Sequence, residues 1–255
     1  MKRLISFAIL AAIGAVAYVE YGPIESTVTV ADAQAVPIGT NGSMFMVSMR
    51  MQNDGPAVTL TEVRSPVGAG VLIMNPGYAD APLVIPANSE GLLAMDGAHI
   101  MLSIAGDTFS EGTFQSISLG FDDGSEVVTR VIHAGQGAMQ HDNAIGVEED
   151  LAPSVEIIPP ETISADGFDV ILAVDNFNFV MAADDASHQP HQGHAHIYLN
   201  GLKLGRMYED RFRVGALTPG EYRLRVGLNT NDHRPYEVSG STVEATLQFR
   251  IGNAQ

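Results

Sequence analysis

Apolar and polar positions alternate with a period of two over much of the chain. At 222–228 and again at 243–251, apolar residues take every second position and mostly polar residues take the positions between. This pattern is typical of a strand with one buried face. Shorter stretches of the same kind predict further strands at 44–51, 71–74, 99–104, 114–121 and 127–132. No amphipathic helix longer than two turns is expected, so the fold class is predicted to be all-β.

Turn signals and spacing divide the predicted strands into two groups. Asp122-Asp123-Gly124-Ser125 and Asn200-Gly201 are hairpin signals between strands. Residues 134–151 are rich in Gly, polar and acidic residues without periodicity, which predicts a linker. Two tandem antiparallel β-sandwiches, cupredoxin-like or Ig-like and about 100 residues each, are expected at 24–133 and 152–255.

The first residues predict export. Lys2 and Arg3 precede an uncharged run, 4–19, and Ala15-Val16-Ala17 forms an A-x-A processing site. We interpret residues 1–17 as a secretory signal peptide, with an uncleaved anchor as the alternative. Gly, Pro or acidic residues interrupt the later apolar runs, so no membrane contact beyond this segment is expected. The predicted compartment is the periplasm.

The amino-acid composition limits which metal ligands and which partners the chain can have. The 255 residues include 11 Met and 8 His but no Cys, and the formal net charge is -17. Without cysteine there are no disulfides or thiolate ligands, so a soft metal must be held by Met and His. With 13 basic against 30 acidic side chains, nucleic acid is excluded as a partner. Residues 20–151 contain 17 acidic and 3 basic side chains. This excess of negative charge produces an electrostatic field that attracts cations.

His99 and Met101 are the first candidate metal ligands. On a strand, residues two apart share one face, with Cα atoms about 7 Å apart. A thioether beside an imidazole suits Cu(I) far better than Ca²⁺ or Mg²⁺. Spacing alone is a weak signal here, because a strand Met usually packs in a core and a single His usually lies at the surface.

Several segments in order resemble a known family. They are VTVADAQAVPIGTNGSMFMVSMRMQNDG, TEVRSPVGAGVLIM, LVIPANSEGLLAMDGAHIML and EGTFQSISLGFDDGSEVVTRVI. Over residues 26–133 they resemble PCuAC, a periplasmic copper chaperone domain. The resemblance implies a cupredoxin-like sandwich that binds Cu(I) and delivers it to the Cu(A) site of cytochrome oxidase. It places a closing His-x-Met pair at His99 and Met101 and the first ligand at Met74.

The sequence departs from that family in one respect. The family's middle Met has no counterpart, because residues 75–94 contain neither Met nor His. A replacement ligand is available from Met44 and Met46 on one face of the strand at 44–51, from Met49 and Met51 on the other, or from Met95. The alternative for each of these methionines is core packing.

A second cluster lies at His188–His196, where HQPHQGHAH places four imidazoles in nine residues. His194 and His196 share a strand face with Tyr198, and His233 in the loop NTNDHRPY is the expected third ligand. Such a set suits Cu(II), with Zn or Ni as the alternatives, and Asp232 or Asn231 is expected to orient a ring. The other residues that could extend either site are His188, His191, Met139, His141 and Met181. A solvated His-rich loop is the competing interpretation.

The second half is also similar to an exported β-sandwich module with GHAHxYxxG and LNxNDH segments, for which no activity is established. The predicted function is copper carriage, with copper ions as ligand and the cytochrome oxidase Cu(A) subunit or another copper chaperone as partner. No catalytic residues and no enzyme activity are expected. The alternatives are a copper-dependent redox enzyme whose ligands resemble those of Cu/Zn superoxide dismutase, and an exported scaffold or adhesion module without metal.

Overall fold

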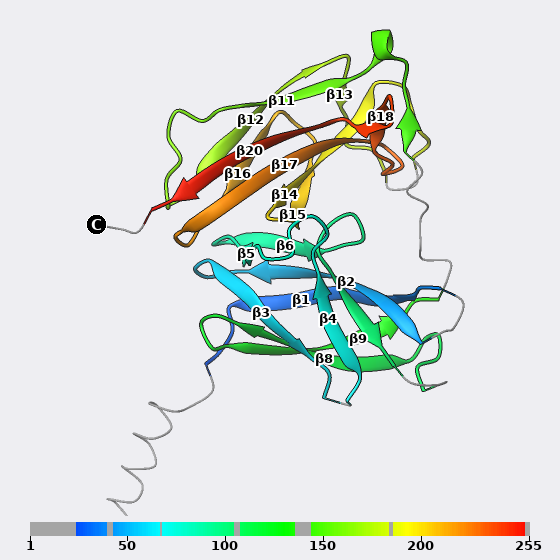
Figure 1. The fold of residues 1–255 in the computed structure, drawn as a ribbon, viewed down its shortest axis with the longest axis vertical. Helices are drawn as coiled ribbons and strands as arrows, with labels where there is room; N and C mark the ends of the chain where they lie inside the picture. The colour runs from blue at the N-terminus through cyan, green and yellow to red at the C-terminus, as the bar shows by residue number, and fades with distance from the viewer. Residues whose placement is uncertain are drawn as a thin grey trace, which may run out of the picture.

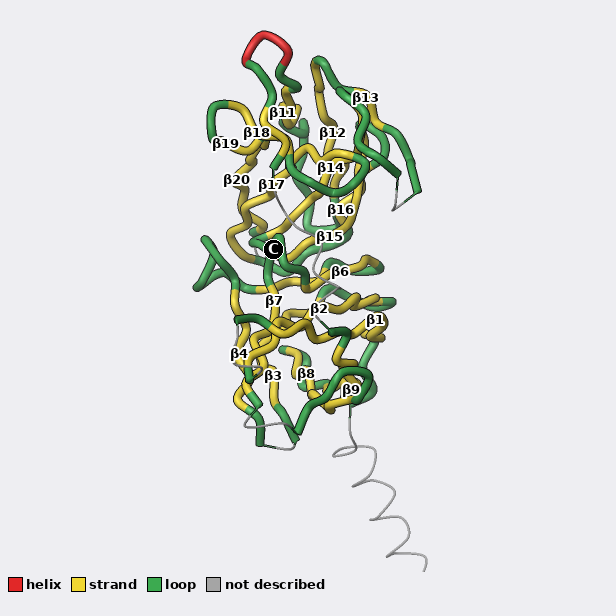
Figure 2. Tube along the Cα trace, turned by 90° about the vertical axis from the view of Figure 1, so that its right-hand side faces the viewer, coloured by secondary structure: helices red, strands yellow, loops and turns green. Residues whose placement is uncertain are grey.

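The computed structural model describes residues 24–39, 43–66, 68–104, 108–135, 144–183 and 186–252, and nearly all the regular structure in them is β-strand (Figure 1). The predicted signal peptide, 1–17, lies outside these residues. In the described part of the chain the one helix is the 3₁₀ turn Glu149–Leu151, drawn red in Figure 2. No helix there is long and apolar enough to cross a membrane. The all-β prediction is therefore confirmed.

The strands form an N-terminal and a C-terminal unit. The N-terminal unit contains β1 (Val28–Pro37), β2 (Met44–Asn53), β3 (Val58–Arg64), β4 (Gly70–Met74), β5 (Leu83–Ile85), β6 (Ser89–Leu93), β7 (His99–Ser103), β8 (Phe114–Phe121) and β9 (Glu126–His133). The C-terminal unit contains β10 (Ile145–Gly146), β11 (Ser154–Ile158), β12 (Phe168–Asp175), β13 (Asn178–Phe179), β14 (Gln192–Leu199), β15 (Leu202–Met207), β16 (Arg211–Val214), β17 (Gly220–Thr230), β18 (Tyr236–Val238), β19 (Ser241–Thr242) and β20 (Glu244–Ile251).

Strand β2 organises the N-terminal unit. It pairs with β1 along one edge, and along the other with β7 at residues 44–47 and with β6 at residues 49–53. Strand β4 continues the sheet beyond β7, while β1 leads through β9, β8 and β3 to β5. The buried positions alternate as the sequence predicts: Ile100 and Leu102 of β7 are fully buried, whereas His99 and Met101 lie on the other face and are half-buried.

Strand β14 lies at the centre of the C-terminal unit, between β15 and β17, and β20 extends this sheet. A second sheet, β11-β12-β16, contributes Phe168, Val170 and Leu172 to the same apolar core. The two-residue hairpin predicted at Asn200-Gly201 joins β14 to β15, and both residues have positive φ, 50° and 87°. This combination is the type I′ geometry that Asn-Gly favours.

The two units are stacked along the long axis, with β6 facing β15 at the junction (Figures 1 and 2). The pair Lys203↔Leu92 joins their main sheets. Side-chain hydrogen bonds cross the same junction, including Asn75 Nδ2 to the Asn200 carbonyl at 2.8 Å. Almost every residue of β14, beside this junction, is buried.

Most pairings are antiparallel, as predicted, but three short ones are parallel: β1 with β9, β13 with β14, and β10 with β18. The last of these involves the predicted linker, since Ile145 and Gly146 pair with Tyr236 and Glu237 of the C-terminal unit. The hairpin at 122–125 joins β8 to β9 as expected. The domain boundaries 24–133 and 152–255 stay a prediction.

Candidate metal centre

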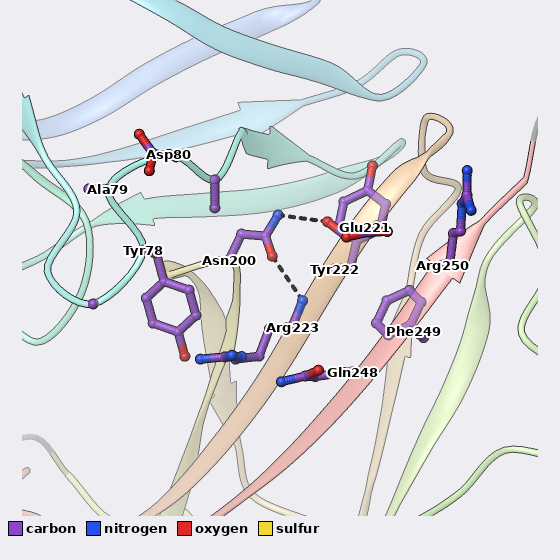
Figure 3. Close-up of a pocket in the computed structure, with 12 residues that line it drawn as sticks. Tyr78, Ala79, Asp80, Asn200, Glu221, Tyr222, Arg223, Gln248, Phe249 and Arg250 are labelled. Carbon is purple, nitrogen blue, oxygen red and sulfur yellow. Dashed lines mark hydrogen bonds between the residues drawn. The ribbon is translucent and has the colours of Figure 1, made fainter.

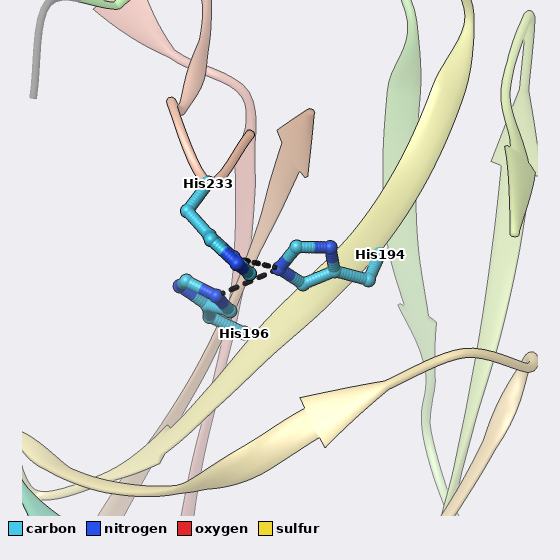
Figure 4. A group of neighbouring side chains, drawn as sticks. All are labelled: His194, His196 and His233. Carbon is cyan, nitrogen blue, oxygen red and sulfur yellow. Dashed lines mark hydrogen bonds between the residues drawn. The ribbon is translucent and has the colours of Figure 1, made fainter. Parts of the chain in front are cut away.

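Three imidazoles converge on one face of β14 (Figure 4). His194 and His196 are two residues apart on this strand, and His233 reaches them from the loop after β17. His194 Nε2 lies 3.0 Å from His196 Nε2 and 3.1 Å from His233 Nδ1. One nitrogen from each ring lies within 4.8 Å of the others, so the three can share one ion.

Local backbone requirements place these rings. Strands β14 and β17 approach so closely at Gly193 that a Cβ there would lie 1.9 Å from the Asn229 carbonyl oxygen. His233 has φ 67°, a left-handed conformation held by the His233 N–H donating to the Thr230 carbonyl at 3.0 Å. Asn229 Nδ2 also donates to the His233 carbonyl at 3.1 Å. Gly193 therefore allows the close approach of β14 and β17 beside His194, and the tight turn at His233 directs the third ring toward the other two.

The spacing of the nitrogens fits a bound metal ion. Bonds of about 2.0–2.1 Å to a tetrahedral metal separate neighbouring ligand nitrogens by about 3.3 Å. Two of the three separations, 3.0 and 3.1 Å from His194 Nε2, lie close to that value, and all three lie within 4.8 Å. Three imidazoles leave a fourth position open, and the donor set suits Cu(II) or Zn.

Burial keeps two of these rings neutral. His194 and His196 are 2% and 3% exposed. Burial, together with the neighbouring His196 and His233, lowers the pKa of His194 to about 2. Burial also lowers the pKa of His196 to about 4, although the hydrogen bond to Asp96 acts in the opposite direction. Neutral imidazoles carry the lone pairs that a metal needs.

A carboxylate from the N-terminal unit contacts this site. Asp96 Oδ2 lies 2.9 Å from His196 Nδ1, and it accepts hydrogen bonds from the Tyr198 hydroxyl at 2.7 Å and from Lys203 Nζ at 2.8 Å. Burial raises the pKa of Asp96, but the bond from His196 and the charge of Lys203 outweigh it and hold that pKa far below its ordinary value. Sequence reasoning missed Asp96 and Lys203, because no motif links either residue to the histidines.

A cavity of about 230 Å³ opens beside the third histidine. His233, Asp96, Tyr198 and Glu244 are among its lining residues. Arg225 forms one wall, with its guanidinium 3.8 Å from the centre of the Tyr198 ring and 3.1 Å from Glu244 Oε2. The imidazole site therefore borders a space that a small ligand could enter.

The other predicted ligands share one face of the β2–β7–β4 sheet. Met74 pairs directly with His99, and Met101 pairs with Leu72 on one side and with Met46 on the other. Directly paired residues of antiparallel strands project to the same face, as do residues two apart. Met46 therefore lies on the same face as Met74, His99 and Met101, directly opposite Met101. We call these four residues the Met/His face.

The Met/His face is accessible. Met74 is 38% exposed, while Met46, His99 and Met101 are half-buried. His99 Nδ1 lies 3.0 Å from the Gly97 carbonyl oxygen, which can only accept, so Nδ1 carries the proton and Nε2 holds a lone pair. Met49 and Met51, on the opposite face of β2, are buried in the core. The core-packing alternative therefore describes Met49 and Met51.

The structure does not bring the remaining candidates into the imidazole cluster. His191 Nδ1 lies 2.9 Å from the Asn176 carbonyl oxygen, and the His188 ring lies 6.0 Å from that of Tyr236. Asp232 pairs with Arg234 at 2.7 Å, and it is Asp96 that contacts a metal-site ring. Met95 and Met181 are exposed at 38% and 77%. Two further candidates, Met139 and His141, lie outside the described residues.

A larger cleft of about 640 Å³ lies at the junction of the two units (Figure 3). Asn200 lies on its floor, accepting from the Arg223 N–H at 2.8 Å, and Tyr78 forms one side with the Arg223 guanidinium 5.5 Å from its ring centre. Its described lining residues include no histidine or methionine. The candidate metal ligands therefore lie at β14 and on the Met/His face, away from this cleft.

Comparisons with known proteins found likenesses at the level of structure. No family model matches the chain, and no curated relative matches it. It is similar to the copper-bound PCuAC domain from PmoF2, at 15% identity and a TM-score of 0.38, over 44% of this chain and 96% of that one. It is also similar to the apo PCuAC domain from PmoF1, at 19% identity and a TM-score of 0.39, over 43% and 95%. Red sea bream transglutaminase matches at 11% identity and a TM-score of 0.23, over 93% and 33%.

Proposed function

We propose that the chain is an exported copper-binding protein that carries copper at two sites of different softness. The convergence of His194, His196 and His233 on one buried strand face is the observation that supports this proposal most. Three imidazole nitrogens with an open fourth position suit Cu(II), with Zn as the alternative.

The Met/His face is proposed as the second site, for Cu(I). Met46, Met74 and Met101 supply thioethers and His99 supplies Nε2, a donor set of the softness that Cu(I) prefers. Because these side chains are accessible and contain no thiolate, copper held here can pass to another protein without forming a disulfide.

The cellular role is carriage of metal, with no substrate turned over. We propose a periplasmic location, which rests on the predicted signal peptide, and the Cu(A) subunit of cytochrome oxidase or another copper chaperone as recipient. The division into a chaperone-like unit at 24–133, a linker at 134–151 and a His-rich unit at 152–255 is part of this proposal.

Equilibrium dialysis of the mature chain tests the two sites separately. With Cu(I) under anaerobic conditions, one equivalent should bind, and the His99→Ala/Met101→Ala variant should lose it. With Cu(II), one equivalent should bind, and His194→Ala/His196→Ala should lose it while keeping the Cu(I) equivalent. Unchanged stoichiometry in either double variant would show that the corresponding assignment is wrong.

A copper redox enzyme is the second candidate function. The cavity of about 230 Å³ beside His233 favours it, because a ligand there would lie close to the open coordination position. Superoxide dismutation by the copper-loaded chain distinguishes the two functions. Turnover that is abolished in His194→Ala/His196→Ala would favour the enzyme, and none above that of free copper would favour the carrier.

A further inference from the structure

One turn of the N-terminal unit contacts both candidate sites. It joins β6 to β7 at residues 94–98 and is closed by the Ala94 N–H donating to the Ala98 carbonyl at 2.8 Å. The Ala98 N–H donates across the junction to the Gly201 carbonyl at 2.9 Å, which fixes the turn against the β14–β15 hairpin. These two hydrogen bonds hold the backbone of the turn in place, and the side chain of Asp96 extends from it toward His196.

The side chain of Asp96 determines which nitrogen of His196 faces the cluster. An ionised carboxylate can only accept hydrogen bonds, so the contact between His196 Nδ1 and Asp96 Oδ2 at 2.9 Å favours the tautomer with its proton on Nδ1. Lys203 Nζ approaches both ring nitrogens, at 3.0 Å from Nδ1 and 3.2 Å from Nε2. The lone pair is then on Nε2, the atom that lies 3.0 Å from His194 Nε2. A carboxylate behind a metal-binding imidazole also raises the basicity of the ligand nitrogen.

Asp96 has a second effect through charge. Lys203 is 7% exposed, and its Nζ lies 3.0 Å from His196 Nδ1 and 2.8 Å from Asp96 Oδ2. A buried ammonium at this distance repels a metal cation unless a carboxylate offsets it. Asp96 is the charged acceptor that contacts both Lys203 and His196 within the described residues.

We propose that Asp96 is a positioning residue for the imidazole site, supplied by the N-terminal unit to a site whose ligands all belong to the C-terminal unit. The proposal rests on the proposed metal binding at His194, His196 and His233. It makes the site complete only while the two units are docked. The same turn orients His99 through the Gly97 carbonyl at 3.0 Å, so one short segment sets the proton position on an imidazole of each site.

The test uses Asp96→Asn in the full mature chain, which keeps the side-chain shape and removes the charge. Two quantities are measured: the dissociation constant for Zn²⁺ by chelator competition, and the ¹⁵N shifts of the His196 ring in the metal-free protein. We expect Zn²⁺ binding to weaken about 10- to 100-fold. The His196 signals should change from a single Nδ1–H form to a mixture of tautomers, a change that a purely structural role would not produce.

Glu90→Gln is the matched control, because this neighbouring β6 carboxylate contacts Arg50 at the surface, 3.6 Å away. It should leave both quantities unchanged. Because Asp96→Asn leaves Lys203 buried without its carboxylate, the double variant Asp96→Asn/Lys203→Met is measured as well. Because the double variant leaves no unpaired buried charge, it should fold. Mixed tautomers are expected again, with Zn²⁺ binding weaker than in the wild type but tighter than in Asp96→Asn, since the repulsion from Lys203 is gone.

The two proposals fail in different ways. Wild-type affinity together with a single Nδ1–H form in Asp96→Asn, or in the double variant if the single one does not fold, would overturn the role of Asp96 and leave the metal site standing. If the wild-type chain itself binds no Zn²⁺ or Cu²⁺, the proposed function fails, and the role of Asp96 fails with it.

Discussion

Replacing His233 by Asn separates metal binding at the imidazole site from folding. His233 contributes one of three converging nitrogens from a turn with φ 67°. Asn tolerates this left-handed conformation better than most residues, so the turn should persist in the metal-free variant. The substitution thus removes a ligand and leaves the backbone that carries it in place.

The expected magnitude follows from the ligand count. Structural zinc sites with four ligands are worth about 10–16 kcal/mol, so one imidazole accounts for about 3 kcal/mol, or about 10²-fold in the dissociation constant. At a metal concentration of about 100 times that constant, the wild-type chain gains about 2.7 kcal/mol against unfolding. His233→Asn at the same concentration gains about 0.4 kcal/mol.

Thermal unfolding with and without Zn²⁺ or Cu²⁺ measures this difference. For a chain of this size about 1 kcal/mol shifts Tm by about 2–4 °C, so the metal should raise Tm by about 5–11 °C in the wild type and about 1–2 °C in the variant. His191→Asn is the control, because His191 also has a positive φ, 58°, and lies outside the cluster. A full metal-induced shift in His233→Asn, or an equal loss in His191→Asn, would refute the assignment.

Three further predictions concern the other features of the fold. Met46→Leu should weaken Cu(I) binding about 10²-fold in a chelator competition. Met49→Leu is the control, because Met49 lies on the opposite, buried face of β2; it should leave Cu(I) binding unchanged and lower the free energy of unfolding by less than about 1.5 kcal/mol. Gly193→Ala should lower the free energy of unfolding in urea by about 1–3 kcal/mol, because its Cβ would meet the Asn229 carbonyl oxygen; an unchanged midpoint would contradict the close approach. The folded pKa values of His194 and His196, about 2 and about 4, lie below the unfolded value of about 6.5, so the unfolded chain binds protons more readily than the folded one. In the metal-free protein, the free energy of unfolding should therefore fall by about 3 kcal/mol for each of the two as the pH drops from about 6.5 to about 4. Replacing both by Gln should flatten urea unfolding against pH over that window.

Much of the architecture was predictable because it depends on local pattern. Period-two alternation predicted strands that coincide with β2, β7, β8 and β9 to within two residues. The Asn200-Gly201 hairpin followed from turn chemistry, since both residues adopt the positive φ that Asn and Gly tolerate. The alternation also predicted that His99 and Met101 share a face, and that His194 and His196 share another.

The sequence alone left the choice among the methionines open. Met46 and Met49 lie three positions apart in the segment MFMVSMRM, where apolar residues fall on both faces of the strand. Only strand pairing shows that Met46 is opposite Met101 on the accessible face while Met49 enters the core. Register is a tertiary property, because a slip of one residue would exchange the two faces.

The sequence by itself determined the strands, the turns and the kinds of donor atom available: imidazoles and thioethers in a chain with no thiol. The tertiary structure decided which donors meet. It brought His233 to β14 across 37 residues of chain from His196, and it placed Asp96 of the other unit behind that ring. The physical reason is that local propensities act within a few residues, whereas tertiary packing buries almost all of β14 and selects the partner of each polar group.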